Sequence, residues 1–498
     1  MLSRKAICTF ALAAALLGTN SATAETTLRI AMTAADIPTA TGLPNNGFEG
    51  MRFLGYPIFE GLVLWDLTRT DQLATLRPGL AESWEQDHED TGTWIFHLRH
   101  GVKFHDGTDF SADAVIWNLD RYFNSSSPQY EPPSSAMSRA RVPLMGSYKK
   151  IDDFTVAITT TRPASYLPYM AVYLLFTSPA SFEKAGHDWA KVATLPAAGT
   201  GPFKITRIVP RQEADLARWD QYWDKSKLAK VDNVVLMPIP EANSRLAALR
   251  SGQLDVAYGD ATTADAAAHA GLTVIGEPTG WDGINIVDRS GTDSKPIGDV
   301  RVRQALNYCI DRKGLVELLN GTAEPSVGWL KASDPDFGNP ENHYKFDPAK
   351  GKALLAEAGY TAAKPLSFKV MISNSGSGQM LPLPMNEYLQ QNLKEACGVD
   401  VDFDVVEWQV LLTAARATPD SPNLHGTMSL NISSPSSDAG IMARYFSSSN
   451  FSPNGFNFEQ WKDDQFDEAL KTIETSTDPK AVSAAYRKAH ERLVDNPP

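Results

Sequence analysis

The hydrophobic residues of this chain recur with two periods, which predict strands and helices that alternate along the sequence. Over residues 94–98, large apolar side chains alternate with more polar ones, as a strand with one buried face requires. Residues 154–158 repeat this alternation, and residues 27–31 have the composition of an earlier strand. From Asp299, a good N-cap residue, apolar positions recur every three or four residues and predict an amphipathic helix.

A further segment predicts a strand, a helix and a second strand in quick succession. Residues 231–240 have the pattern of a buried strand, and Leu246 and Leu249 then lie three residues apart before Gly252, a helix C-cap candidate. Residues 254–258 alternate as the next strand. Two strands joined by a helix over so few residues form a βαβ unit, so we expect a parallel sheet here.

The first residues have the pattern of a secretion signal. Arg4 and Lys5 precede an apolar run over residues 6–17, and small residues lead to a cleavage site after Ala24. The apolar run is well short of the ~20 residues that a membrane-spanning helix needs. Cys8 lies inside this run and not after a small-residue lipobox, so we expect no lipid anchor. The sequence predicts a signal peptide over residues 1–24 and a free periplasmic protein.

Length and charge narrow the class of protein. The remaining chain, residues 25–498, is too long for one core, because chains beyond ~250–300 residues usually divide into domains. The formal net charge is −13, and it becomes −15 when Arg4 and Lys5 are removed with the signal. This charge argues against nucleic acid or an anionic membrane as partner.

Five phrases along the chain resemble one known family. They are FHDGTDFSADAV (104–115), AAGTGPFKI (197–205), NSRLAALRSGQLDVA (243–257), DVRVRQALNYCIDRKGL (299–315) and AKGKALLAEAGY (349–360). In this order and behind a signal peptide, the chain resembles the peptide/nickel/opine class (family 5) of extracytoplasmic solute-binding proteins, which feed ABC importers. The resemblance covers the chain from about Leu28 to its end.

The resemblance implies a fold and a way of working. The fold is mixed α/β, periplasmic binding protein-like type II (cluster C), with two lobes around a cleft and an extra third domain. Lobe one is expected over residues 25–57 and 196–275, the inserted second domain over 58–195, and lobe three over 276–498. Relatives usually continue past the position of Asp495 with a return into lobe one, so we expect that return to be missing here. Ligand would shift the lobes toward a closed form that an inner-membrane permease with its ATPase subunits recognises, and the protein is expected to be a monomer.

The mature chain has two cysteines, Cys309 and Cys397, in a compartment that permits disulfides. Cys309 lies on the apolar stripe of its predicted helix. The pairing arithmetic allows a disulfide, but we favour the reading of Cys309 as a small buried hydrophobic residue.

The sequence does not favour an enzyme. His97, His100 and His105 lie close together, but their spacing matches no zinc pattern, and we expect solvated or hydrogen-bonded histidines. The acidic pair at residues 463–464 is expected to be a solvated face. The glycines at residues 199–201 fit a tight turn better than a phosphate cradle, because no GxxxxGK[ST] is present. There is also no G-x-S-x-G elbow. We therefore expect no catalytic activity, no cofactor and no metal.

Two segments bear on the substrate. In peptide-binding members of the resembled family, a Gly-Trp-x-x-Asp stretch supplies an aspartate for the peptide amino group, and a loop of lobe three often supplies an arginine for its carboxylate. Here Asn431 and Ser434 occupy the tryptophan and aspartate positions, and Asn374 and Ser375 lie in the loop. A shift of four residues would instead bring Asp438 into the aspartate role.

Neutral donors and acceptors suit a hydroxyl-rich ligand better than a dipeptide. The leading expectation is a sugar, a glycoside or an opine-like compound. The alternatives are an oligopeptide or dipeptide, a nickel chelate and, with less support, a substrate of a secreted hydrolase.

Five more residues are candidates to line the cleft. Trp281 and Asn285 lie on the hinge side, Tyr130 comes from the second domain, and Arg444 with Tyr445 follow the Ser-rich loop. An aromatic ring can stack on a ligand, and an arginine can clamp a carboxylate or phosphate. Core packing is an equal alternative for Trp281 and Tyr445, and a surface ion pair is the favoured alternative for Arg444.

Overall fold

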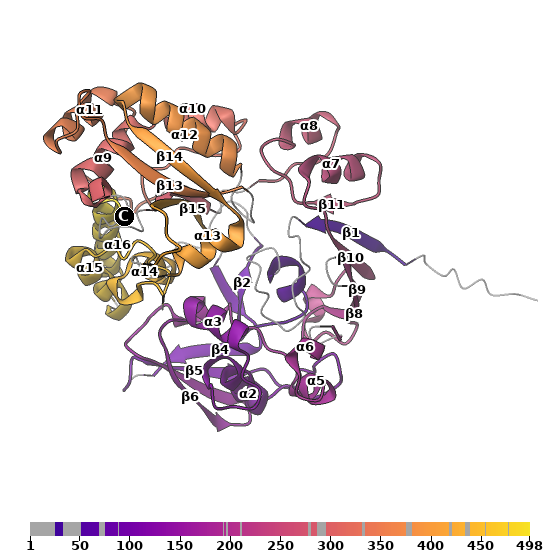
Figure 1. Ribbon diagram of the computed structural model, residues 1–498. Helices are drawn as coiled ribbons and strands as arrows, with labels where there is room; N and C mark the ends of the chain where they lie inside the picture. Colours follow the sequence, from indigo (N-terminus) through magenta and orange to yellow (C-terminus); the bar gives the residue numbers. More distant parts are fainter. Residues whose placement is uncertain are drawn as a thin grey trace, which may run out of the picture.

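The computed structural model describes the chain outside residues 1–24, 33–50, 69–74, 88, 193, 196–197, 210–211, 277–279, 286–294, 331–333, 375–380, 418–420, 434–438, 454 and 477. Within these described parts the chain forms four β-sheets with helices packed around them, which confirms the mixed α/β class (Figure 1). No described helix has both the length and the apolar character that a membrane span requires. The predicted signal peptide lies outside the described residues.

The residues expected to form lobe one contain a sheet of strand order β11-β1-β10-β9-β8, and the names lobe one, second domain and lobe three are used below for the three segments predicted from the sequence. Its strands and helices are β1 (Thr27–Met32), β8 (Phe203–Val209), β9 (Glu213–Arg218), β10 (Asn233–Pro238), β11 (Val256–Ala257), α7 (Ala242–Arg250) and α8 (Ala264–His269). Strand β1 pairs in parallel with both β10 and β11, and α7 connects these two, so the predicted βαβ unit is confirmed. Strands β9 and β8 add to the sheet in antiparallel pairs, so the sheet is mixed and not wholly parallel.

The second domain is built on an antiparallel sheet of order β4-β5-β7-β6, beside the hairpin of β2 and β3. Its elements are β2 (Val63–Asp66), β3 (Thr75–Pro78), β4 (Ala81–Gln86), β5 (Thr93–Leu98), β6 (Met145–Asp152), β7 (Thr155–Thr160), α2 (Ala112–Phe123), α3 (Pro132–Arg141), α4 (Leu167–Ala171), α5 (Pro179–Lys184) and α6 (Trp189–Val192). Strands β5 and β7 confirm the two strands that were predicted from the alternation at residues 94–98 and 154–158. The short π-helix η1 (Met51–Gly55) precedes this domain.

The glycines that return the chain to lobe one are required by a close backbone approach. A Cβ atom on Gly199 would lie 2.0 Å from the carbonyl oxygen of Ile58, and one on Gly201 would lie 2.6 Å from that of Pro57. Heavier side chains are excluded at both positions. The prediction that backbone geometry explains the glycines of this turn is confirmed.

Lobe three contains a sheet of order β12-β15-β13-β14 and most of the helices. Its elements are β12 (Gly280–Asn285), β13 (Ser367–Ser373), β14 (Asp400–Val406), β15 (Thr427–Ser433), α9 (Val300–Cys309), α10 (Arg312–Leu318), α11 (Pro348–Glu357), α12 (Pro382–Cys397), α13 (Trp408–Ala415), α14 (Ala439–Phe446), α15 (Asp464–Thr475) and α16 (Pro479–Asp495). Asp299 caps α9 by accepting a hydrogen bond from the backbone N–H of Arg301, as predicted.

The expectation of a solvated face at residues 463–464 is wrong for Asp463. Only 8% of Asp463 is exposed, and its carboxylate caps α15 through the N–H groups of Gln465 and Phe466. Arg492 of α16 donates to the same carboxylate at 2.6 Å. The side chain therefore ties the last two helices together, which a count of adjacent acidic residues does not reveal.

The preference for Cys309 as an unbridged residue is also wrong, because Cys309 and Cys397 form a disulfide. Helices α9 and α12 pack on the same side of the lobe-three sheet and bring the two Cα atoms to 6.0 Å, a distance that a disulfide spans. Gly351 of α11 leaves the space for it, since a Cβ there would lie 2.4 Å from the Cys309 Sγ atom. Burial of Cys309 within the apolar cluster was predicted correctly.

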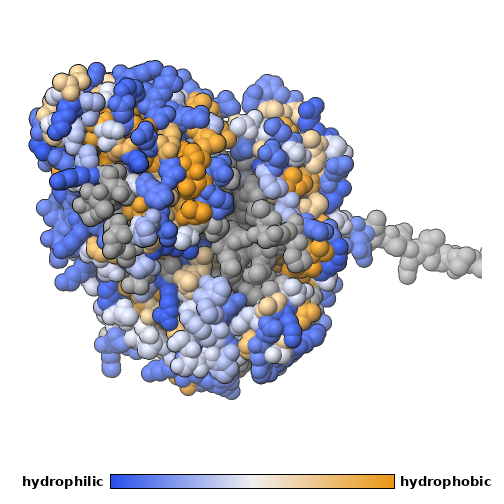
Figure 2. Space-filling view, viewed as in Figure 1, coloured by the Kyte–Doolittle hydropathy of each residue, from blue (hydrophilic) through white to orange (hydrophobic). Residues whose placement is uncertain are grey.

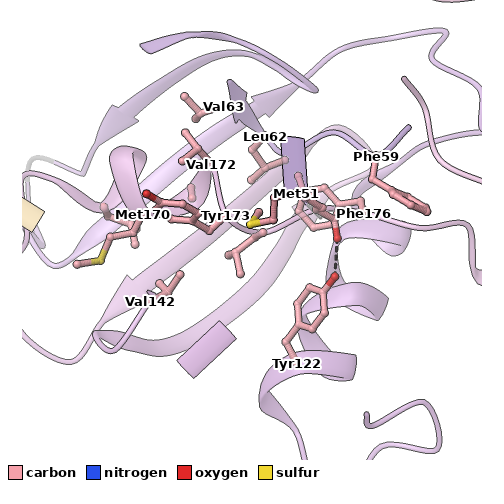
Figure 3. Packing of buried hydrophobic residues seen from close by; sticks show 14 of the residues in the cluster. Met51, Phe59, Leu62, Val63, Tyr122, Val142, Met170, Val172, Tyr173 and Phe176 are labelled. Atoms are coloured by element: carbon pink, nitrogen blue, oxygen red, sulfur yellow. Dashed lines mark hydrogen bonds between the residues drawn. The ribbon is translucent and has the colours of Figure 1, made fainter. Parts of the chain in front are cut away.

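A single apolar cluster runs through the second domain and reaches both lobes. It contains Leu236 of lobe one, Phe96 and Tyr173 of the second domain, and Phe446 and Phe466 of the helices that end lobe three. Figure 3 shows its centre, where Met51 lies beside Tyr173 and Val172. The second domain therefore supports both lobes from one side.

Two buried carboxylates fasten these junctions. Glu60 accepts hydrogen bonds from Tyr222 Oη at 2.7 Å, Trp223 Nε1 at 2.7 Å and Thr200 Oγ1 at 2.9 Å, and burial raises its pKa. Glu474 of α15 accepts from Tyr166 Oη at 2.7 Å and forms an ion pair with Arg162. Each carboxylate is 2–3% exposed, so its bonds lie within the packed junction.

We predict that replacing both cysteines, Cys309→Ala with Cys397→Ala, lowers the free energy of unfolding by about 2–4 kcal/mol, because the bridge closes a long loop in the unfolded chain. Thermal melting of the two proteins measures the difference. Dithiothreitol should lower the melting temperature of the wild type and leave the double variant unchanged. Equal melting temperatures of wild type and double variant would argue against the bridge.

His105 fixes the second domain against the Gly199 turn. Its ring accepts from the Gly199 N–H at Nδ1 (3.3 Å) and donates from Nε2 to the Gly201 carbonyl (2.9 Å), as the prediction of a hydrogen-bonded histidine requires. Burial lowers the pKa of His105 to about 4. The ring must be neutral to accept at Nδ1, so a proton breaks this contact.

We predict that His105→Gln reduces the loss of stability in mild acid. A histidine with a lowered folded pKa contributes fully above about pH 6.5, and this contribution falls by up to about 3 kcal/mol as the pH drops toward 4. The melting temperatures of the wild type and of His105→Gln should therefore approach each other between pH 7 and pH 4, because the variant loses less stability than the wild type. The exposed His269→Gln is the matched control and should follow the wild type. Parallel curves for His105→Gln would contradict the assignment.

Candidate ligand-binding site

The carboxyl ends of three parallel strands meet at one edge of the lobe-three sheet. Strand β13 pairs in parallel with β14 and with β15, so Ser373, Val406 and Ser433 end their strands on the same side. In open α/β sheets ligands bind outside the carboxyl ends of the strands. Helix α13, which directly follows β14, lies on the side of lobe three that faces lobe one (Figure 1).

A furrow separates the two lobes on this face of the molecule (Figure 2). Lobe three forms its left wall and lobe one its right wall, with apolar surface gathered along the lobe-three wall. The arrangement is that of two lobes around a cleft.

The backbone register brings several predicted site residues to this edge. Trp281 of β12 pairs with Ile432, next to Asn431 near the end of β15, and Asn374 directly follows β13. Asn374 is exposed, and its N–H donates to the Val406 carbonyl at 3.1 Å across the strand ends. Ser375, Ser434 and Asp438 lie outside the described residues.

Two predicted residues are not at this edge. Asn285 pairs with Met428 at the opposite end of β15. It follows Trp281 by four residues along β12 and therefore lies about 13 Å from it. Tyr130 is half-buried in the second domain and precedes α3, where its N–H donates to the Ser127 carbonyl.

Helix α14 carries the remaining candidates from the sheet edge into the junction with the second domain. Arg444 is 3% exposed and Tyr445 is 7% exposed, so the expectation of a surface ion pair for Arg444 is wrong. The Arg444 Nη2 group donates to Tyr445 Oη at 3.0 Å. Tyr445 belongs to the continuous apolar cluster, so core packing, one of the two equal alternatives for this residue, is what the structure shows.

Arg141, at the end of α3, lies close to Arg444 and was not among the residues singled out from the sequence. It is 5% exposed, and its guanidinium lies 4.8 Å from the centre of the Tyr173 ring. The guanidinium of Arg444 lies 5.6 Å from the same ring. Two positive groups from parts of the chain 300 residues apart therefore meet at one tyrosine.

The described residues contain no group of three His, Cys, Asp or Glu side chains arranged to hold a metal ion. What the site offers a ligand is hydrogen-bond donors, aromatic faces and positive charge. Such groups can hold a small solute in a fixed orientation. The fold and the site therefore define a two-lobe binding protein for small solutes.

Comparison with known proteins places the chain in a family. The model described as "Bacterial extracellular solute-binding proteins, family 5 Middle" matches residues 75–454, more than half of the chain. The protein belongs to this family and is the substrate-binding component of an ABC importer. The resemblance drawn from the five phrases is confirmed.

Individual relatives are distant in sequence and close in fold. The dipeptide-binding protein of Escherichia coli K12 is 25% identical over 466 residues, which cover 89% of this chain and 82% of the relative. The structure of DppA from Helicobacter pylori with peptide STSA has a TM-score of 0.75 at 21% identity, covering 95% of this chain and 91% of that one. MoaA from A. tumefacien R10 with mannopinic acid has a TM-score of 0.73 at 21% identity, with the same two coverages. These structures share the type II two-lobe architecture.

Proposed function

We propose that the protein is exported through the signal peptide of residues 1–24, captures one small solute between lobe one and lobe three as a monomer, and presents the closed form to an inner-membrane permease with its ATPase subunits. Its homologues are periplasmic binding proteins, which supports the compartment. The proposal keeps the division into lobe one, second domain and lobe three made from the sequence.

The observation that carries this proposal is the edge where β13, β14 and β15 end together. Backbone groups and short polar side chains at strand ends can converge on a ligand from one wall of a cleft. Trp281, Asn374 and Asn431 are placed at or next to this edge by the register. A solute held there would contact lobe one only when the furrow closes, and such differential contact is what shifts an open state to a closed one.

The proposed solute is a sugar, a glycoside or an opine-like compound. Neutral Asn431 and Asn374 at the strand ends support a ligand rich in hydroxyl or amide groups. MoaA, a structural relative, is solved with mannopinic acid, which favours the opine-like class among these. A dipeptide, an oligopeptide or a nickel chelate is the second candidate, because other relatives hold peptide STSA or Ni(L-His).

We predict that a ligand of the leading class stabilises the protein by about 2.7 kcal/mol at a hundred times its dissociation constant. A thermal-shift screen with sugars, opines, dipeptides and nickel chelates measures this. Trp281→Ala should weaken binding of the responding solute at least tenfold, since an aromatic face is lost. Phe346→Ala removes an aromatic side chain that is 47% exposed in lobe three, and serves as the matched control. If only dipeptides raise the melting temperature, the leading class of solute is rejected. If no solute raises it, the capture of a solute is rejected.

We also predict that the protein secreted by its host begins at Glu25. Intact-mass measurement of the periplasmic fraction tests this, because cleavage after Ala24 removes a defined mass. A protein that retains Met1 in that fraction would contradict the assigned cleavage site.

A further inference from the structure

A hydrogen bond joins lobe one directly to lobe three. The Asn320 side chain, which follows α10, donates from Nδ2 to the backbone carbonyl of Ala261, which precedes α8, at 2.8 Å. The two residues are 59 positions apart in the sequence. Figure 1 shows α8 and α10 near the end of the two lobes that points away from the second domain. The second domain and this hydrogen bond therefore link the lobes at opposite ends.

A small apolar cluster surrounds this hydrogen bond. Ala261 of lobe one is 4% exposed and packs with Leu319 and Met385 of lobe three, which are 2% and 3% exposed. Moving the lobes apart would expose apolar surface of this cluster to water, so the cluster favours contact between the lobes. We call this contact the latch, and it consists of Ala261, Leu319, Asn320 and Met385.

The backbone on the lobe-one side of the latch is held in one conformation. The Asp260 carboxylate accepts hydrogen bonds from the N–H groups of Thr262 and Thr263, at 2.9 Å and 3.2 Å. The Asp260 carbonyl accepts from the N–H of Ala264 at 3.0 Å. These bonds lie on both sides of Ala261 in the sequence, so its carbonyl points in a fixed direction.

The lobe-three side of the latch is fixed as well. Asn320 has a φ of 52°, the left-handed conformation that asparagine adopts more readily than most residues. Its N–H donates to the Glu317 carbonyl at 3.0 Å, which holds it at the end of α10. Tyr388 of α12 donates to the carbonyl of Asp311, the N-cap of α10, at 3.1 Å. Because each partner is fixed within its own lobe, the bond forms only at one relative position of the two lobes.

The chain connections do not impose this contact, yet they tie it to the proposed site. Helix α8, which follows Ala261, ends eleven residues before β12 begins at Gly280, so a long connection separates the two lobes along the chain. Helix α12, which carries Met385, begins nine residues after Ser373 ends β13. The latch therefore lies on a helix that follows directly from the strand edge of the proposed site.

We propose that Asn320 is a positioning residue for solute capture, and that its bond to Ala261 holds lobe three against lobe one before the solute arrives. This inference rests on the proposed function, since closure of the lobes is what captures the solute. One hydrogen bond changes an equilibrium constant by a factor of about two to ten, which is too little to keep every molecule closed. The free protein therefore exchanges between a latched and an open form, and the solute shifts it toward the latched form.

The experiment measures the radius of gyration of Asn320→Asp, Ala261→Leu and the wild type by small-angle X-ray scattering, without any solute. Asn320→Asp keeps the size of the side chain and replaces the N–H donor by an acceptor, which cannot bond to the Ala261 carbonyl. Ala261→Leu places a larger side chain between the lobes. The matched controls are Asn423→Asp and Ala268→Leu, the same changes at exposed positions of lobe three and lobe one.

We expect both latch variants to have a larger radius of gyration than the wild type, because the open form becomes more populated, and both controls to match the wild type. Near-UV circular dichroism and the melting temperature establish that each variant is folded. Folded latch variants with the radius of gyration of the wild type would overturn the inference.

The role in capture is tested by titrating each protein with glucose, mannopinic acid and alanyl-alanine. For a probe that binds the wild type, the dissociation constant should rise at least about twofold in Asn320→Asp and about tenfold in Ala261→Leu, and stay unchanged in the controls. Unchanged dissociation constants in both latch variants would overturn the role of Asn320 in capture. If no probe binds the wild type, capture of these three classes of solute is rejected, and the radii of gyration alone decide on the latch.

Discussion

The continuous apolar core through the second domain is the constraint on which the rest of this structure depends. It reaches Leu236 of lobe one on one side and Phe446 and Phe466 of lobe three on the other, so these parts of the chain fold against one common support. The buried carboxylates Glu60 and Glu474 fix each contact by hydrogen bonds that would be costly to leave unmade. Because α14 packs on this core, Arg444 is brought to Tyr173 and hence to Arg141.

The same arrangement places the second domain against both lobes. The strand ends of lobe three and the facing side of lobe one border the furrow, whereas the second domain lies beneath both (Figures 1 and 2). A solute held at the ends of β13 and β15 would contact lobe one only when the two lobes approach each other. Capture would then be coupled to closure through one ligand.

Local patterns were enough to predict much of the fold. The alternation at residues 94–98 and 154–158, the cap at Asp299 and the βαβ unit around α7 are all present, because short-range periodicity and capping decide them. The disulfide and the role of Asp463 were missed, because both depend on helices that meet only after folding. Arg139 and Arg141 show the same limit. They are the same residue type two positions apart, yet Arg139 is exposed and Arg141 is buried against Met51 and Tyr173, which lie far away in the sequence.

The most direct measurement of the central claim, capture of a solute between the two lobes, is small-angle X-ray scattering of the protein with and without a solute that raises its melting temperature. We expect the radius of gyration to fall when the solute is present, because the lobes close on it. A radius of gyration that stays unchanged at a saturating concentration of that solute would contradict the claim.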